Sequence, residues 1–342
     1  MREFFFTDWE GPWVTTDFAY EISLLFFKNP AFFERLSQYD DYLSYIRKKK
    51  DYEAGDTLKL LSPFLLAFGV TSEKIREFSR IAVRFIPDAR ISIRYIKIKP
   101  VVISTSYRQF LEESARILGI NQHLHGTEFN IEDFSVDKED KRILKEAVDT
   151  IASLPEIKVK PGMRENEMDE DSMKSVYWLD EFFWKKMMSS SFRDVLEEVK
   201  AIGGERKKKI VRKYVENFDI EEIVAIGDSI SDHSMLKWVK ERDAGIAVSF
   251  NGNEYAIRNS DAAVVSDTTF GEVAIIDAFA KMGVEGLIEI IKSGNMNLIR
   301  DEIAKNLSNT KFYWLEDSDI EKVIEESEKM RRKLRGGAGK LA

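Results

Sequence analysis

Four carboxylate side chains in this sequence are spaced in a way that suits the binding of a metal ion. Asp8 and Glu10 follow a run of three phenylalanines, and Asp228 and Asp232 follow a second apolar run. An apolar run that ends in a carboxylate is typical of a buried parallel strand that delivers this residue to the ligand-binding edge of a sheet. Clustered carboxylates without histidine or cysteine favour a hard cation such as Mg²⁺. An aspartate that only shapes a turn is the simpler explanation for any one of them.

Three further polar side chains suit a phosphate group. Ser104 and Thr105 stand between a short apolar run and a helix predicted over Tyr107–Leu118, where free backbone N–H groups and the helix dipole favour an anion. Lys207 lies in the first turn of a predicted helix and shares its apolar face. A hydroxyl and a lysine complete a cradle for a phosphoryl group, with Asp8 as the nucleophile. Helix capping explains the hydroxyls equally, and a lysine at the edge of an apolar face commonly extends toward solvent.

Apolar segments of strand length alternate with amphipathic segments of helix length along much of the chain. This alternation predicts an α/β fold with a doubly wound, mostly parallel sheet. Two long helical stretches interrupt it, so we expect two inserted modules, and the chain after Val284 is predicted to be helical up to residue 335. The predicted strands are Phe4–Phe6, Val101–Ile103, Glu222–Ile226, Ala244–Val248 and Ala262–Val265.

These elements divide the chain into a core and three additions. The first insertion follows the strand that carries Asp8 and is rich in aromatic residues, which we expect to form its own apolar core. The predicted parts are residues 1–14, 98–130 and 200–283 for the core, 15–97 for the first, helical insertion, 131–199 for the second insertion, and 284–342 for a C-terminal helical segment with a glycine-containing tail.

The composition is that of a globular protein and excludes several classes of function. The chain has 342 residues, 33% of them charged, and a formal net charge of −8, which argues against nucleic-acid binding. It contains no cysteine, so disulfides and cysteine nucleophiles are excluded. No uncharged apolar run has the length of a membrane span, and the first residues lack the pattern of a signal peptide. We therefore expect no membrane association and a cytoplasmic location, while the oligomeric state stays open.

Four segments, taken in order, resemble the motifs of the haloacid dehalogenase-like (HAD-like) hydrolase superfamily. Asp8-Trp9-Glu10-Gly11-Pro12 is similar to its first motif, Asp-x-Asp-Gly-Thr, and Val101-Val102-Ile103-Ser104 to its second, an apolar strand that ends in Ser or Thr. Lys207 with Ile210 is similar to the Lys-x-x-Ile that contains the lysine of the third motif. Gly227-Asp228-Ser229-Ile230-Ser231-Asp232 is similar to the fourth motif, Gly-Asp-x-x-x-Asp. The likeness is nearest to the phosphoserine phosphatase-like branch.

This resemblance implies a Rossmann-like HAD core whose first insertion is a helical cap over the active site. It also implies a Mg²⁺-dependent phosphatase that hydrolyses a small phosphorylated metabolite through an aspartyl-phosphate intermediate. The implied roles are nucleophile and metal ligand for Asp8, acid/base and, through its backbone carbonyl, metal ligand for Glu10, phosphate binding for Ser104, Thr105 and Lys207, direct metal ligand for Asp228, and water-mediated ligand for Asp232.

The sequence departs from the family pattern at two positions, which keeps alternatives open. Glu10 stands where the family has Asp, and its extra methylene moves the carboxyl group by about an ångström, a shift that costs on the order of a hundredfold in rate. Pro12 stands where Thr is usual. A phosphate- or metabolite-binding module without hydrolytic activity, and a phosphotransferase or mutase, are therefore alternative hypotheses. Metal binding by His123, His125 and His233 is set aside, because alternate residues of a strand point in opposite directions.

Overall fold

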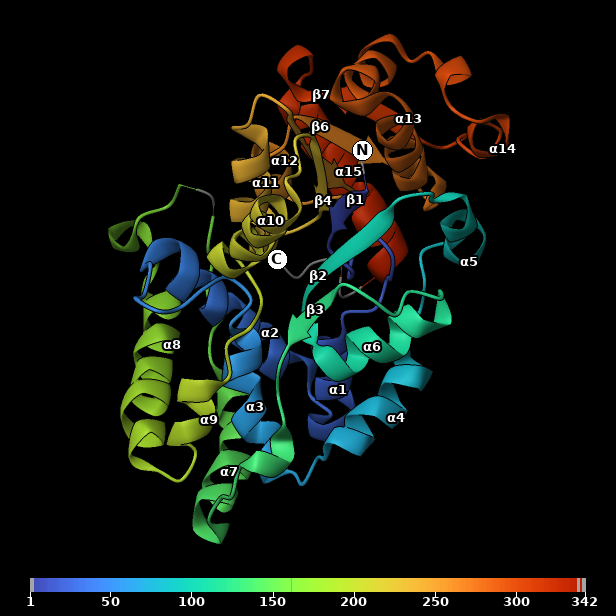
Figure 1. Ribbon diagram of the computed structural model, residues 1–342. Coiled ribbons are helices and arrows are strands. Elements are labelled where there is room, and N and C mark those ends of the chain that lie inside the picture. The colour runs from blue at the N-terminus through green and yellow to red at the C-terminus, as the bar shows by residue number, and fades with distance from the viewer. Residues whose placement is uncertain (1–2, 161, 337–338, 340–342) are drawn as a thin grey trace.

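The computed structural model describes residues 3–160, 162–336 and 339 and consists of a sheet with flanking helices next to a helical lobe (Figure 1). Within these residues the sheet has seven strands in the order β3-β2-β1-β4-β5-β6-β7. All neighbouring strands are parallel except β6 and β7. The predicted α/β class with a mostly parallel sheet is confirmed. The strands are β1 (Phe4–Thr7), β2 (Lys99–Tyr107), β3 (Leu124–Thr127), β4 (Ile223–Gly227), β5 (Gly245–Phe250), β6 (Ala262–Val265) and β7 (Lys311–Trp314).

Helices cover both faces of the sheet, because successive side chains of a strand point to opposite faces. Phe4 and Phe6 pack in one apolar cluster with residues of α10 and α11, whereas Phe5 belongs to the cluster on the other face, which includes residues of α6 and α13. The helices on this part of the chain are α5 (Ala89–Ser92), α6 (Arg108–Ile117), α10 (Glu205–Phe218), α11 (His233–Lys240), α12 (Glu254–Arg258), α13 (Phe270–Ser293), α14 (Asp301–Ala304) and α15 (Ile320–Arg335).

The helical lobe lies below the sheet in Figure 1 and combines two distant parts of the chain. The ring of Phe64 contacts Phe27 and Phe32 of the first part, and Phe182 and Phe183 of the second. These two distant parts of the chain therefore share one aromatic core, while the division of the chain into a core and two insertions stays a prediction. The helices of the lobe are α1 (Phe18–Phe27), α2 (Pro30–Asp41), α3 (Thr57–Ala67), α4 (Ser72–Ala82), α7 (Lys138–Ser153), α8 (Glu170–Glu181) and α9 (Arg193–Glu198).

The C-terminal part differs from the prediction of a helical segment from Val284 to residue 335. Strand β7 interrupts the helices and pairs with β6, with Trp314 opposite Ala262 and Lys311 opposite Val265. A partly exposed edge strand lacks the buried apolar run by which the other strands are recognised. Strand β3 was also not predicted. Most of the predicted tail lies outside the described residues.

The sequence leads us to expect no membrane association, and this stays a prediction. None of the helices in residues 3–160 and 162–336 combines the length and the apolar composition of a membrane span. The cytoplasmic location stays a prediction.

Candidate active site

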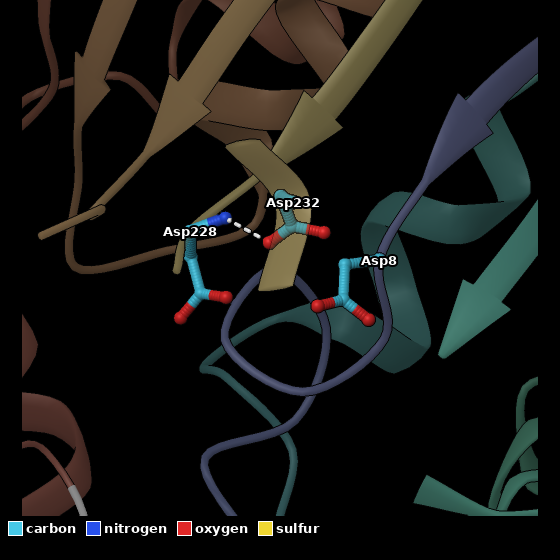
Figure 2. Close-up of side chains that lie close together, drawn as sticks. All are labelled: Asp8, Asp228 and Asp232. Atoms are coloured by element: carbon cyan, nitrogen blue, oxygen red, sulfur yellow. Dashed lines mark hydrogen bonds between the residues drawn. The ribbon is translucent and has the colours of Figure 1, made fainter. Parts of the chain in front are cut away.

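The central strands β1 and β4 bring the two predicted acidic segments together. Thr7 of β1 lies opposite Ile226 of β4, and the backbone N–H of Asp8 donates to the Ile226 carbonyl at 2.9 Å. The strand order reverses between β1 and β4, and α/β sheets bind ligands at such a switch point, outside the carboxyl ends of the strands. Asp8 and Asp228, each one residue past its strand, therefore lie at the ligand-binding edge (Figure 2).

Asp8, Asp228 and Asp232 form a buried acidic group. Each offers a carboxylate oxygen, and these oxygens lie within 4.8 Å of one another. Asp232 also shapes the loop, because its Oδ2 accepts hydrogen bonds from the backbone N–H groups of Asp228 at 2.9 Å and Ser229 at 3.1 Å (Figure 2). The prediction that these three carboxylates meet is confirmed. The side chain of Glu10 lies outside the group.

Lys207 neutralises part of this acidic group from the first turn of α10. Its Nζ lies 2.8 Å from Oδ2 of Asp8 and 2.7 Å from Oδ1 of Asp232, and its side chain is completely buried. The alternative that Lys207 extends toward solvent is therefore wrong. Burial opposes the charged form, but Asp232 and Asp8 outweigh it and raise the pKa of Lys207.

The acidic group suits a hard divalent cation. Burial, followed by the charge of Asp232, raises the pKa of Asp8 well above its usual range even with Lys207 beside it. The donor atoms of the group are all oxygens, as Mg²⁺ prefers. Gly11 makes the close approach possible, because a Cβ atom there would lie 2.1 Å from Oδ2 of Asp228.

Glu10 faces a different part of the site. Its Oε1 accepts hydrogen bonds from the backbone N–H of Phe18 at 2.9 Å and from the hydroxyl of Ser106 at 2.8 Å. Burial, together with the charge of Asp17, raises the pKa of Glu10 to about 8. A carboxyl group with this pKa is mostly protonated at neutral pH, as a general acid must be.

The predicted hydroxyl groups are placed differently from one another. The hydroxyl of Ser104 is buried and accepts a hydrogen bond from the backbone N–H of Ser106 at 3.2 Å. The hydroxyl of Thr105 donates to the carbonyl of Ile202 at 3.0 Å. Thr105 and Ser106 line the cavity beside the acidic group, whereas Ser104 is not one of its lining residues. Ser106 is the third hydroxyl of the same run, which as a whole was expected to suit a phosphate, but it was not among the predicted site residues.

The cavity also contains residues that sequence reasoning missed. It has a volume of about 90 Å³ and is lined by Asp8, Glu10 and Asp228, together with Arg331 and Arg335 of α15. The spacing of Val323, Ile324, Ser327, Arg331 and Arg335 places them on one helical face, and this signal was available in the sequence. The other missed acidic lining residues are Asp17, Asp40 and Asp41.

The histidines take no part in the acidic group. Nδ1 of His123 and Nε2 of His125 both lie 3.0 Å from the hydroxyl of Tyr214. The expectation that their side chains point in opposite directions is wrong, because residues two apart in an extended segment lie on the same side. Nδ1 of His233 is 2.7 Å from the carbonyl oxygen of Ile230.

The fold and the site define a mostly parallel α/β protein with a buried acidic triad able to hold a metal ion. No protein-family model and no curated protein matches the chain. Among solved structures, the gene product AF1437 from Archaeoglobus fulgidus is similar, with a TM-score of 0.86 and 37% sequence identity, over 100% of this chain and 99% of that one. The chain therefore belongs to the same family as AF1437.

Proposed function

We propose that this protein is a magnesium-dependent phosphatase of the HAD-like superfamily that hydrolyses a small phosphorylated metabolite. The observation that carries the proposal is the meeting of Asp8, Asp228 and Lys207 at the carboxyl ends of two central strands, far apart in sequence. A carboxylate nucleophile beside a cation site and a fixed lysine is the arrangement that phosphoryl transfer through a covalent intermediate uses.

In the first step, Asp8 attacks the phosphorus atom. A bond from its carboxylate oxygen to phosphorus forms as the bond to the leaving oxygen breaks, and Glu10 gives its proton to that oxygen. The pKa of Glu10, at about 8, supports this role because the acid form is present at neutral pH. Lys207, 2.8 Å from Asp8, holds the nucleophile in position.

In the second step, water attacks the phosphorus atom of the aspartyl phosphate, the bond to Asp8 breaks, and the now ionised Glu10 takes a proton from the water. The products are an alcohol and inorganic phosphate. Asp8, Asp228 and Asp232 would hold the magnesium ion. When bound, this ion supplies positive charge that favours ionised Asp8 and offsets the charge of the phosphoryl oxygens.

Hydrolysis of p-nitrophenyl phosphate tests the proposal. We expect Mg²⁺-dependent release of nitrophenol that EDTA abolishes, and Asp8→Asn to lower kcat by at least about 1000-fold. Asp171→Asn is the matched control, because Asp171 is exposed and pairs with Lys174 at the surface of its helix. A wild-type protein that is inactive on a broad panel of phosphate esters would contradict the proposal.

A phosphate-binding module without turnover is the second candidate, and the contacts of Asp228 favour it. Nη1 of Arg335 lies 3.0 Å from Oδ2 of Asp228, and Arg331 pairs with the same oxygen, so both compete with a cation. Glu10→Asp separates the candidates. If the protein is a phosphatase, this substitution should raise its rate of ester hydrolysis. If the protein is a binding module, the variant should hydrolyse an ester that the wild type does not.

A further inference from the structure

Helix α15 (red in Figure 1) carries two arginines into the cavity of the candidate active site. Arg331 and Arg335 are four residues apart and therefore share one face of the helix. Their side chains are only 4% and 6% exposed. The first half of α15 is fixed by buried Val323, and by the hydroxyl of Ser327, which donates to the carbonyl of Gly252 at 2.7 Å.

Both arginines contact Asp228, one of the three carboxylates of the candidate metal site. Nη1 of Arg331 donates to the backbone carbonyl of Asp228 at 3.1 Å and pairs with its Oδ2. Nη1 of Arg335 lies 3.0 Å from the same Oδ2. A single carboxylate oxygen thus receives two guanidinium groups.

Two buried arginines share the carboxylate of Asp228 in this arrangement. Arginine stays charged in proteins, and two buried guanidinium groups in contact with one anion repel each other. Nη2 of Arg335 has a second carboxylate, Asp17, at 4.0 Å. A divalent cation at the acidic group would also require Asp228 and would compete with both arginines for it. A cation that binds there takes Asp228 from the arginines, which can then turn to an anion in the cavity.

The surroundings indicate which anion this is. The arginines share the cavity with Asp8, Glu10 and Ser106, the groups at which the proposed phosphoryl transfer takes place. A guanidinium group presents paired N–H donors whose geometry matches the oxygens of a phosphate. A cavity of about 90 Å³ has room for such a group.

We propose that Arg331 and Arg335 are the phosphate-binding arginines of this site. They hold Asp228 in the ligand-free protein, and they turn to the oxygens of the substrate phosphate when a divalent cation takes Asp228. The choice of phosphate as the anion rests on the proposed function. The C-terminal helix is then part of the substrate-binding site and a determinant of its specificity for anions.

Calorimetric titration of the full-length protein tests this assignment without turnover. With Mg²⁺ alone, Arg331→Gln and Arg335→Gln should bind the ion about three- to tenfold more tightly than the wild type, because a competing charge is removed. With Mg²⁺ saturating, both variants should bind inorganic phosphate at least about tenfold more weakly. Arg335→Lys keeps the charge but loses the paired N–H donors. Its affinity for phosphate should therefore lie between those of the wild type and Arg335→Gln.

Arg332→Gln is the matched control, because Arg332 lies on the same helix, is half exposed and pairs with Glu328. Phosphate affinities of Arg331→Gln and Arg335→Gln equal to that of Arg332→Gln would overturn the assignment. So would a Mg²⁺-loaded wild type that binds no phosphate. Thermal melts identify a variant that does not fold, and Arg335→Gln, at the end of the helix, carries the test if Arg331→Gln fails in this way.

The outcomes separate this inference from the proposed function. A wild type that binds phosphate through both arginines but hydrolyses no ester supports the inference and contradicts the phosphatase. A wild type that hydrolyses p-nitrophenyl phosphate with a KM that neither arginine substitution changes supports the phosphatase and overturns the inference.

Discussion

At the scale of single residues, Glu10 is the side chain whose chemistry depends most on its surroundings. One oxygen of its carboxyl group accepts two hydrogen bonds, from Phe18 and Ser106, yet burial and the nearby charge of Asp17 still raise its pKa to about 8. Hydrogen bonds that stabilise the ionised form are therefore outweighed by desolvation. Because burial disfavours the ionised form, Glu10 is a suitable proton donor. For the same reason, its ionisation at high pH lowers the stability of the folded protein.

This balance predicts a pH dependence of stability. The pKa of Glu10 in the folded protein lies above its unfolded value of 4.5. The stabilisation that its protonated form gives to the folded protein is therefore fully present below pH 4.5 and is lost as the pH rises to about 8. Glutamine does not ionise, so Glu10→Gln should not show this loss of stability. In urea unfolding with EDTA, we expect the free energy of unfolding of the wild type to fall by about 4 kcal/mol relative to Glu10→Gln between pH 5 and 9.

Glu197→Gln serves as the control for this measurement, since Glu197 is exposed and forms a surface pair with Arg193. Its stability should follow that of the wild type at every pH. Parallel curves for wild type and Glu10→Gln would show that Glu10 is ionised in the folded protein throughout this range.

At the scale of elements, the loop after β1 must pass close to the loop after β4. Gly11 has a φ of 102°, and a Cβ atom there would lie 2.1 Å from Oδ2 of Asp228. Both the backbone conformation and the space therefore require glycine. This one position sets how closely Asp228 approaches the loop that carries Asp8.

Gly11→Ala should accordingly weaken the cation site as well as the fold. We expect a loss of about 3 kcal/mol in the free energy of unfolding, and Mg²⁺ affinity at least about tenfold lower, because Asp228 must move. Gly69→Ala separates the two effects, since Gly69 has a φ of 70° but no atom within 4 Å of the added Cβ. It should lose about 1 kcal/mol and keep its Mg²⁺ affinity. Equal Mg²⁺ affinities in the two variants would contradict this account.

At the scale of the whole molecule, the helical lobe is joined to the sheet through Asp56. This completely buried carboxylate precedes α3 and pairs with Arg206 of α10, with 2.6 Å between Oδ1 and Nη1. Its Oδ1 also accepts a hydrogen bond from the backbone N–H of Ala201 at 3.0 Å. Since Lys207 follows Arg206 directly, the contact ties the position of the lobe to the residue that neutralises Asp8.

Asp56→Asn should therefore affect stability and site together. The substitution keeps the shape but removes the charge that pairs with Arg206, and we expect a loss of about 3 kcal/mol in urea unfolding, with a lower Mg²⁺ affinity. Asp171→Asn, at an exposed pair with Lys174, should change neither quantity. An Asp56→Asn protein as stable as the Asp171→Asn control would show that the lobe is held by its apolar contacts alone.

The sequence by itself determined the α/β class and the meeting of Asp8, Lys207, Asp228 and Asp232. Apolar runs of strand length mark the buried strands, and right-handed crossovers place the carboxyl ends of parallel strands at one edge. Residues that follow these strands therefore converge wherever they stand in the chain. The same reasoning did not place Glu10, because its partners Phe18 and Ser106 come from segments whose approach depends on packing.

Only the tertiary structure decided what the C-terminal part does. Helical periodicity puts Arg331 and Arg335 on the buried face of α15. Which part of the molecule this face contacts depends on where the helix begins. That point is set by β7, a short strand that forms because the edge of β6 offers it hydrogen bonds from a distant part of the chain. Such pairing is not encoded in any local pattern. The sequence therefore predicted the acidic half of the site, and the fold supplied its arginines.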